Sequence, residues 1–285
     1  MEKMKMPCFE CRDGIFEIDE FECSEIFLIN GTERALVIDT GTGIGDLRSI
    51  IENKIENKPY DVVLSHNHVD HMGGAAWFEK VYIHRNDMDY LSSIYPPTYE
   101  YRKKYAETLR KRENKHYEYT EKDIRPWPIF PSLVSVEDGH IFDLGDRQIK
   151  VIHCPGHTKG ELVFYDNKTR TLLCGDAFNC NWLMDITLAE SLRRCVEISL
   201  HNMKKIYSMR SEFEYVVNSH HDYRKFGSPL APDVMPDLIV CLEKILNGTV
   251  QYRIEEDTIE SGKEKTVACY KDIVVSCPGG DISKI

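Results

Sequence analysis

Val62-Val63-Leu64-Ser65-His66-Asn67-His68-Val69-Asp70-His71-Met72-Gly73-Gly74 is the stretch that decides the fold of this chain. Its apolar, β-branched beginning predicts a buried strand, and its two glycines predict a turn into a helix. Between them stand three histidines and one aspartate within six residues. Imidazole and carboxylate groups are the ligands that zinc, iron and manganese accept. The stretch therefore predicts a metal-binding loop at the end of a strand.

The spacing of these side chains divides them into two pairs. His66 and His68 alternate as i and i+2 beyond an extended strand, so both rings can point to the same side. Asp70 and His71 follow one turn later and can face a second ion a few ångströms away.

Size and composition exclude several classes of protein. The 285 residues carry a net charge of -11, with 42% hydrophobic and 10% aromatic residues. We expect a single domain over residues 1–285, because this length supports one large core. The negative charge argues against a general binder of nucleic acid or membrane surfaces, since no excess of positive charge exists to meet phosphates.

The same features predict a cytoplasmic protein with no membrane partner. No apolar run reaches the roughly 18 to 20 residues that span a bilayer, and the N-terminus lacks the apolar segment of a signal peptide. The ten cysteines are spread along the chain, and a protein of this size does not need disulfides to hold its core. We therefore expect the cysteines to be mostly reduced.

The order of predicted elements places the cluster in a layered α/β protein. Strands are expected at 14–18, 25–29 and 34–39, and Asn30-Gly31 predicts a tight hairpin. A helical pattern over 44–57 then leads to the strand at 61–65, which predicts a βαβ unit with the histidines at the C-terminal end of a strand. Ligand sites of layered α/β proteins lie at such ends. Later strands are expected at 81–84, 148–153, 162–165, 171–174 and 215–217, and near 249–255 and 266–276; helices are expected at 187–209 and 232–247.

Residues 86–130 break this order. The segment is rich in tyrosine, has basic stretches at 102–104 and 110–112, and has helical character over about 99–113. We interpret it as an insertion that lies over the metal site as a lid. The alternative is a solvated amphipathic helix with no role in substrate binding.

Three later strands also end in candidate ligands. His157, Asp176 and either His220 or His221 each follow an apolar run and stand beside glycine or serine, where the backbone can turn. One histidine after a strand is usually structural. Their recurrence after a dense cluster of histidine and aspartate favours one shared metal centre.

These motifs, in this order, resemble the metallo-β-lactamase-fold hydrolase superfamily. The matching pieces are Val37–Gly41, Ser65–His71, Pro155–Thr158, Leu173–Asp176 and Val217–His220, within residues 25–221. The resemblance implies an α/β fold built as a four-layer αββα sandwich, with two metal ions in a cleft at the edge of its sheets. It implies that the first metal is held by His66, His68 and His157, the second by Asp70, His71 and His220, and both by Asp176.

One motif departs from the family pattern. The family usually has Pro-Gly-His at the last site, whereas this chain has Asn218-Ser219-His220-His221. Counting from the preceding strand favours His220, with His221 as the alternative. The presence of His71 places the resemblance on the glyoxalase II, lactonase and RNase Z side of the superfamily.

The ligand set predicts hydrolysis. Two divalent cations, zinc in the first place with manganese or iron as alternatives, would make a bridging hydroxide available at neutral pH. We expect this hydroxide to attack an ester, thioester or lactone-type carbonyl of a small molecule, with Asp70 as the catalytic residue that orients it. Asp39 is either a hydrogen-bond partner of a ligand histidine or only a turn-forming residue. Tyr223 and the tyrosines of the insertion are candidates for stabilising a developing oxyanion.

Three other interpretations use the same residues. A phosphodiesterase or nuclease is the first alternative; an RNase Z-like enzyme would need a basic RNA-binding arm, which only residues 102–112 could supply. A persulfide dioxygenase would bind one iron, whereas the complete ligand set favours two ions. A metal-stabilised binding module without turnover predicts that some ligands are lost, and none is lost.

Overall fold

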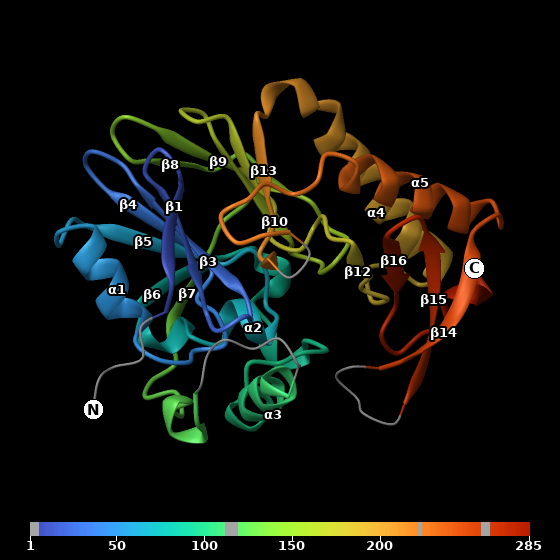
Figure 1. The fold of residues 1–285 in the computed structure, drawn as a ribbon, viewed down its shortest axis with the longest axis horizontal. Helices are drawn as coiled ribbons and strands as arrows, with labels where there is room; N and C mark the ends of the chain where they lie inside the picture. Colours follow the sequence, from blue (N-terminus) through green and yellow to red (C-terminus); the bar gives the residue numbers. More distant parts are fainter. Residues whose placement is uncertain (1–5, 112–118, 222–223, 258–262) are drawn as a thin grey trace.

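The computed structural model describes residues 6–111, 119–221, 224–257 and 263–285. Over these residues the strands form three sheets, two of which pack face to face with helices on their outer sides (Figure 1). The first sheet contains, in sequential order, β1 (Cys8–Arg12), β2 (Ile15–Asp19), β3 (Glu25–Asn30), β4 (Ala35–Ile38), β5 (Tyr60–Val63), β6 (Lys80–Ile83) and β7 (Ser132–Ser135). Its outer face packs against α1 (Leu47–Lys54), α2 (Val69–Met72) and α3 (Tyr99–Arg110).

The predicted βαβ unit is confirmed. Strands β4 and β5 pair in parallel, with Val37 opposite Val62, and α1 connects them. Helix α1 begins where the Asp46 side chain accepts a hydrogen bond from the Ser49 backbone N–H, as an N-cap residue does. It buries Leu47 and Ile51 against the sheet. The loop after β5 therefore leaves the carboxyl end of a buried parallel strand.

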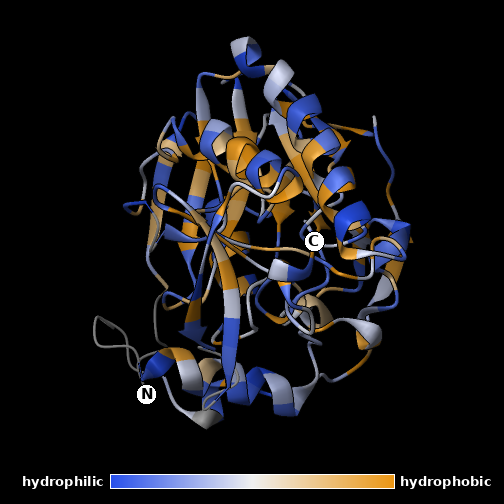
Figure 2. Cartoon of the chain, turned by 90° about the vertical axis from the view of Figure 1, so that its right-hand side faces the viewer, coloured by the Kyte–Doolittle hydropathy of each residue, from blue (hydrophilic) through white to orange (hydrophobic). Residues whose placement is uncertain are grey.

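The second sheet has the order β13-β11-β10-β9-β8. Its strands are β8 (Ile141–Asp143), β9 (Gln148–His153), β10 (Leu162–Asp166), β11 (Thr171–Leu173) and β13 (Tyr215–Val217). Helices α4 (Leu192–Ser208) and α5 (Val234–Leu246) pack on its outer face. In Figure 2, where these helices face the viewer, hydrophilic and hydrophobic residues alternate along them, as burial of one side requires.

Three groups of buried apolar side chains separate four layers. One group lies between the two sheets, where Phe27 and Leu36 of the first sheet share a core with Phe164 and Leu173 of the second. A second group joins the first sheet to α1, α2 and α3, and a third joins the second sheet to α4 and α5. The fold is therefore the expected αββα sandwich.

A third sheet was not predicted. Its strands are β14 (Gln251–Glu256), β15 (Glu264–Tyr270), β16 (Ile273–Ser276) and β12 (Asn181–Leu183), in the order β12-β16-β15-β14. The single run expected near 266–276 is two strands, because the chain turns at Lys271, whose φ is 51°. Strand β12 escaped notice because it has three residues and pairs only with β16, far along the chain.

The segment 86–130 connects two neighbouring parallel strands, β6 and β7. Its predicted helix is present as α3, and the end of that prediction lies outside the described residues, as does Tyr223. All ten cysteines are free thiols. In the described part of the chain, no helix has both the length and the apolar character needed to cross a bilayer.

Candidate metal centre

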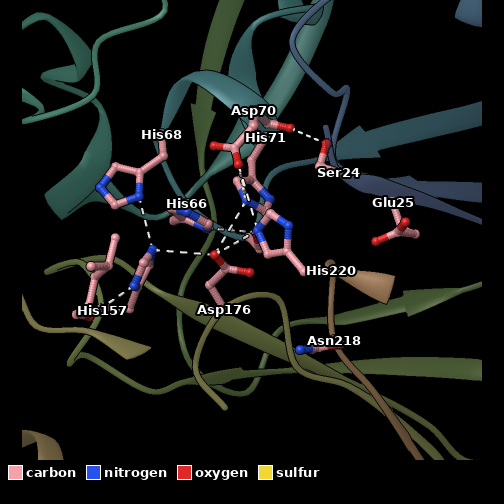
Figure 3. Close-up of polar contacts among 12 residues, drawn as sticks. Ser24, Glu25, His66, His68, Asp70, His71, His157, Asp176, Asn218 and His220 are labelled. Atoms are coloured by element: carbon pink, nitrogen blue, oxygen red, sulfur yellow. Dashed lines mark hydrogen bonds and ion pairs between the residues drawn. The ribbon is translucent and has the colours of Figure 1, made fainter. Parts of the chain in front are cut away.

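Seven side chains from four strand ends meet at one edge of the sandwich (Figure 3). His66 and His68 lie in the loop after β5, and Asp70 and His71 lie on α2, which directly follows. His157, Asp176 and His220 come after β9, β11 and β13. The site thus contains every residue expected from the sequence, and all of them are buried except His220, which is partly exposed.

The first group is formed by His66, His68 and His157, whose candidate ligand atoms lie within 4.8 Å of one another. Nε2 of His157 is 2.9 Å from Nδ1 of His68. Nδ1 of His157 donates to the backbone oxygen of Leu183 at 3.0 Å, which directs Nε2 into the site. This arrangement presents three ring nitrogens to one point.

The second group is formed by Asp70, His71 and His220. Oδ2 of Asp70 lies 3.7 Å from Nε2 of His71 and 3.6 Å from Nε2 of His220. Oδ2 of Asp176 stands between the two groups, at 3.6 Å from Nε2 of His157, 3.7 Å from Nε2 of His71 and 3.1 Å from Nε2 of His220. Asp176 therefore contacts both groups with one oxygen.

The structure distinguishes His220 from His221. His220 faces Asp70 and Asp176, whereas His221 turns away and contacts Glu25 through both its backbone N–H, at 2.9 Å, and its Nδ1 atom. With Asp19, these two residues form a separate group, in which Asp19 and Glu25 are buried and His221 is partly exposed. His220, and not His221, therefore occupies the candidate ligand position that the sequence left open between the two histidines.

The chemistry of the donor set fits divalent cations. Nε2 of His66, Nε2 of His71 and Oδ1 of Asp176 are buried and have no hydrogen-bond partner among the described residues. Buried polar atoms without partners cost about 1 to 3 kcal/mol each, so a native site that contains several requires an explanation. Cations bound between these atoms would supply the missing partners, with His66, His68 and His157 around one and Asp70, His71 and His220 around the other.

Asp39 holds the ligand loop in place. Its carboxylate accepts hydrogen bonds from the Ser65 backbone N–H at 2.7 Å, from the Ser65 hydroxyl at 2.8 Å and from Nδ1 of His71 at 2.9 Å. Asp39 is fully buried and has a φ of 67°, a left-handed conformation that aspartate tolerates better than most residues. The structure shows the contact between Asp39 and His71, a candidate ligand, and it also shows Asp39 at the turn after β4.

The two glycines after the histidines are required by close packing. A Cβ on Gly73 would lie 2.4 Å from the Thr42 oxygen, and one on Gly74 would lie 2.3 Å from the Thr40 oxygen. Thr40 in turn donates to the backbone oxygen of His71 from both its N–H and its hydroxyl, each at 2.8 Å. The turn after β4 and the ligand helix α2 therefore pack as one unit.

Glu161 is a site residue that the sequence analysis missed. Its Oε2 lies 3.3 Å from Nδ1 of His66, and its Oε1 accepts a hydrogen bond from the Asp176 backbone N–H at 3.1 Å. Nδ1 of His66 is also 2.9 Å from the Ser65 hydroxyl, whose proton goes to Asp39. Nδ1 of His66 therefore carries the hydrogen, and its Nε2 lone pair faces the site. The available signal was a carboxylate directly before the apolar run of β10.

The Tyr-rich segment reaches the site through Tyr105 of α3. The Tyr105 hydroxyl donates to Oδ2 of Asp70 at 2.7 Å, and the ring of Tyr95 lies edge-on to His68, with centroids 5.0 Å apart. Trp127 donates to the backbone oxygen of Gly73 at 2.8 Å. The segment therefore lies against the loop that carries the candidate ligands, and its role toward a substrate stays a prediction.

Charge separates the two groups of ligands. Burial, followed by the neighbouring imidazoles, holds the pKa of His66 and of His68 well below the usual range, so both rings are neutral at pH 7 and their lone pairs are free for a cation. Burial also opposes charge on His71, but Asp70, Asp39 and Asp176 together raise the pKa of His71 well above its usual value. The carboxylates of the site are thus gathered around the second group, where they favour positive charge.

A polar cleft opens beside the first group. Its volume is about 260 Å³, and it is bordered by His68 and His157. Its other walls carry mostly hydroxyl, amide and carboxylate groups, among them those of Asn67, Ser92, Asp185 and Thr187. The cleft provides hydrogen-bonding groups and direct access to the candidate metal centre.

Comparison with known proteins identifies relatives of this chain. The human protein named acyl-coenzyme A thioesterase MBLAC2 is 29% identical over 195 residues, which cover 61% of this chain and 66% of that protein. The atrochrysone carboxyl ACP thioesterase dmxR1 of Cryptosporiopsis sp. (strain 8999) is 26% identical over 151 residues, covering 51% of this chain and 35% of that protein. The matched region is thus no more than about two thirds of either relative.

A solved structure shares the fold. The metallo-beta-lactamase family protein of Thermus thermophilus superposes with a TM-score of 0.56 at 18% identity, covering 84% of this chain and 82% of the other. The sequence model of the metallo-beta-lactamase superfamily matches residues 24–188, a range that includes His66, His68, Asp70, His71, His157 and Asp176. The chain belongs to the metallo-beta-lactamase superfamily.

Proposed function

We propose that this protein is a metal-dependent hydrolase with two divalent cations, preferably zinc, that cleaves acyl thioesters. The observation that carries the proposal is the set of seven converging side chains, in which Asp176 contacts both groups and three buried ligand atoms lack hydrogen-bond partners among the described residues. A site for a single cation would not need the second group of Asp70, His71 and His220.

Bound between these side chains, two cations would lower the pKa of a water molecule toward 7 and would stabilise negative charge on a carbonyl oxygen. The protein's own contribution is to orient the ligands. Asp39 holds His71, Glu161 and Ser65 hold His66, and the Leu183 carbonyl holds His157, so that Nε2 of each ring faces the centre. Asp70 belongs to the second group, where its carboxylate can also accept a hydrogen bond from the attacking water and orient it.

The choice of thioesters has two supports. Both relatives described above carry thioesterase names, one for acyl-coenzyme A and one for an acyl carrier protein. The cleft beside His68 and His157 offers donors and acceptors in place of an apolar tunnel. Such walls suit a polar thiol portion of the substrate, with amide and hydroxyl groups to satisfy.

The test combines metal analysis with a substrate panel. The purified protein should contain two equivalents of zinc or manganese and should hydrolyse acyl-coenzyme A thioesters faster than matched oxyesters, lactones or bis-(p-nitrophenyl) phosphate. An Asp70→Ala variant should lose this activity.

The other outcomes each identify an alternative. One equivalent of iron with oxygen uptake on a glutathione persulfide would support a dioxygenase. Preferential cleavage of the phosphodiester would support a nuclease-type enzyme. Full thioesterase activity in Asp70→Ala would refute the assigned role of that carboxylate.

A further inference from the structure

Helix α3 is fixed rigidly beside the candidate metal centre. The Thr98 side chain caps its first turn by accepting from the Tyr101 N–H, and the buried side of the helix carries Arg102, Tyr105, Ala106 and Leu109, at helical spacing. Arg102 is fully buried and donates to the Thr42 oxygen at 2.6 Å and to the Gly43 oxygen at 3.0 Å. The helix is therefore anchored to the same loop that packs on Gly73 and Gly74.

Tyr105 stands one turn after Arg102 on this buried face. Its hydroxyl donates to Oδ2 of Asp70 at 2.7 Å, and only 8% of Tyr105 and 7% of Asp70 are exposed. This Oδ2 atom is also the oxygen that faces Nε2 of His71 and Nε2 of His220. The hydroxyl thus reaches the carboxylate oxygen that points into the second group.

The carboxylate of Asp70 needs such a partner. Helix α2 has only four residues, and the backbone of Asp70 is held by the Ser24 hydroxyl, which donates to its carbonyl at 2.5 Å. These contacts place the backbone of Asp70 and do not involve its carboxylate. Among its described contacts, the Asp70 carboxylate faces two candidate ligands, His71 and His220, and accepts one hydrogen bond from a residue outside the ligand set, Tyr105.

We propose that Tyr105 is a positioning residue that fixes Asp70 for the second cation, so that the Tyr-rich segment sets the occupancy of one metal position and not of the other. The inference rests on the two-cation centre proposed above. The hydrogen bond holds the Asp70 carboxylate in the orientation that faces His71 and His220 before a cation arrives. The described contacts of the first group, formed by His66, His68 and His157, do not involve the Tyr105 hydroxyl, so this group should bind its cation independently.

The same contact argues against a direct role in stabilising an oxyanion. A tyrosine hydroxyl has one proton to donate, and here that proton is given to Asp70. While this hydrogen bond persists, Tyr105 cannot donate to a substrate oxygen. Its influence on the reaction passes through Asp70.

The experiment compares stepwise binding of cobalt(II) to the full chain, freed of metal by a chelator, in the wild type and in Tyr105→Phe. The visible absorption of cobalt reports each equivalent separately, without any substrate. We expect the second equivalent to bind about 10- to 100-fold more weakly in Tyr105→Phe, the usual effect of losing a hydrogen-bond partner of a ligand. The first equivalent should bind as in the wild type.

Tyr119→Phe is the matched control. Tyr119 is also buried, and its hydroxyl also anchors α3, but it donates to the backbone oxygen of Ala106 and not to a ligand. This variant should bind both equivalents as the wild type does. In an Asp70→Ala background, Tyr105→Phe should cause no further loss, because the hydroxyl acts through that carboxylate.

The outcomes are distinguishable. If the wild type binds fewer than two equivalents, the proposed function fails. If it binds two and Tyr105→Phe gives the same two binding curves, the positioning role of Tyr105 alone is refuted. Equal weakening in Tyr105→Phe and Tyr119→Phe would also refute it, since general loosening of α3 would then be the cause.

Discussion

Oε2 of Glu161 lies 3.3 Å from Nδ1 of His66, and both side chains are completely buried. The other oxygen of Glu161 accepts from the backbone N–H of Asp176. One carboxylate thus links a residue of the first ligand group to the residue between the groups. The negative oxygen beside Nδ1 of His66 favours the tautomer with its hydrogen on that nitrogen, which leaves the Nε2 lone pair facing the site.

Glu161→Gln should weaken metal binding by about 10- to 100-fold while leaving the volume of the side chain unchanged. The amide oxygen can still accept from Asp176, which turns the amide N–H groups toward Nδ1 of His66. These N–H groups would oppose the hydrogen that Nδ1 of His66 carries toward the Ser65 hydroxyl, and would displace the ring from the orientation in which its Nε2 faces the site. Competition for zinc against a chromophoric chelator measures the effect, and Glu190→Gln, at an exposed position, is the control. Equal affinities for the two variants would contradict the role of Glu161.

His220→Ala and His221→Ala should have different effects although the residues are neighbours. Removal of His220 takes away a side chain that faces Asp70 and Asp176, so one of two metal equivalents and most of the hydrolase activity should be lost. Removal of His221 leaves Glu25, which is 1% exposed, without its imidazole partner. That variant should retain both metals but lose about 3 kcal/mol in its free energy of unfolding.

Metal counting by mass spectrometry and urea denaturation of the two variants provide the measurements. Loss of a metal equivalent in His221→Ala, with both retained in His220→Ala, would reverse the assignment of the two histidines.

Stability should fall in mild acid because of His84. Burial, followed by the neighbouring His153, lowers the pKa of His84 from about 6.5 in the unfolded chain to about 4, and the two rings stack with centroids 3.9 Å apart. Between these two values the unfolded chain binds a proton that the folded chain does not, so the free energy of unfolding decreases as the pH falls from 6.5 to 4. The ideal slope is about 1.4 kcal/mol per pH unit, and solvent screening at this site should reduce it to roughly half.

His84→Asn should flatten this dependence. Nδ1 of His84 accepts from the Asn86 N–H, and an asparagine oxygen can make the same capping contact, so the local turn should be retained. Urea denaturation of both metal-loaded proteins at several pH values gives the difference, with His201→Asn, at an exposed helix position, as the control. Parallel curves for wild type and His84→Asn would show that His84 is not the source.

Removal of metal should destabilise the protein. A cation present at about 100 times its dissociation constant stabilises the folded state by about 2.7 kcal/mol, and for a chain of this size that corresponds to roughly 5 to 10 °C in melting temperature. Calorimetry before and after chelation, and after zinc is restored, tests this. His220→Ala should show a smaller shift than the wild type. A melting temperature that does not respond to chelation or to added zinc would speak against resident cations.

Much of the fold and of the site follows from local sequence patterns. The run Val62–Leu64 is apolar on both faces and ends at once in histidines, so it predicts a buried strand whose end carries ligands, whatever the rest of the chain does. The same reasoning located His157 and Asp176, and helical spacing located α1, α3, α4 and α5. These features depend on residues close to one another in the chain, which is why the sequence alone predicts them.

Only the tertiary structure decided the contacts between distant segments. His220 and His221 have the same chemistry and adjacent positions, and the packing of β3 against the loop after β13 gives one of them to Glu25 and the other to the metal centre. Glu161 and Tyr105 lie far from His66 and Asp70 in the sequence and meet them only when the sheets and α3 have packed. Local periodicity determines which side chains emerge at a strand end, whereas the partners that orient them are set by the assembly of the layers.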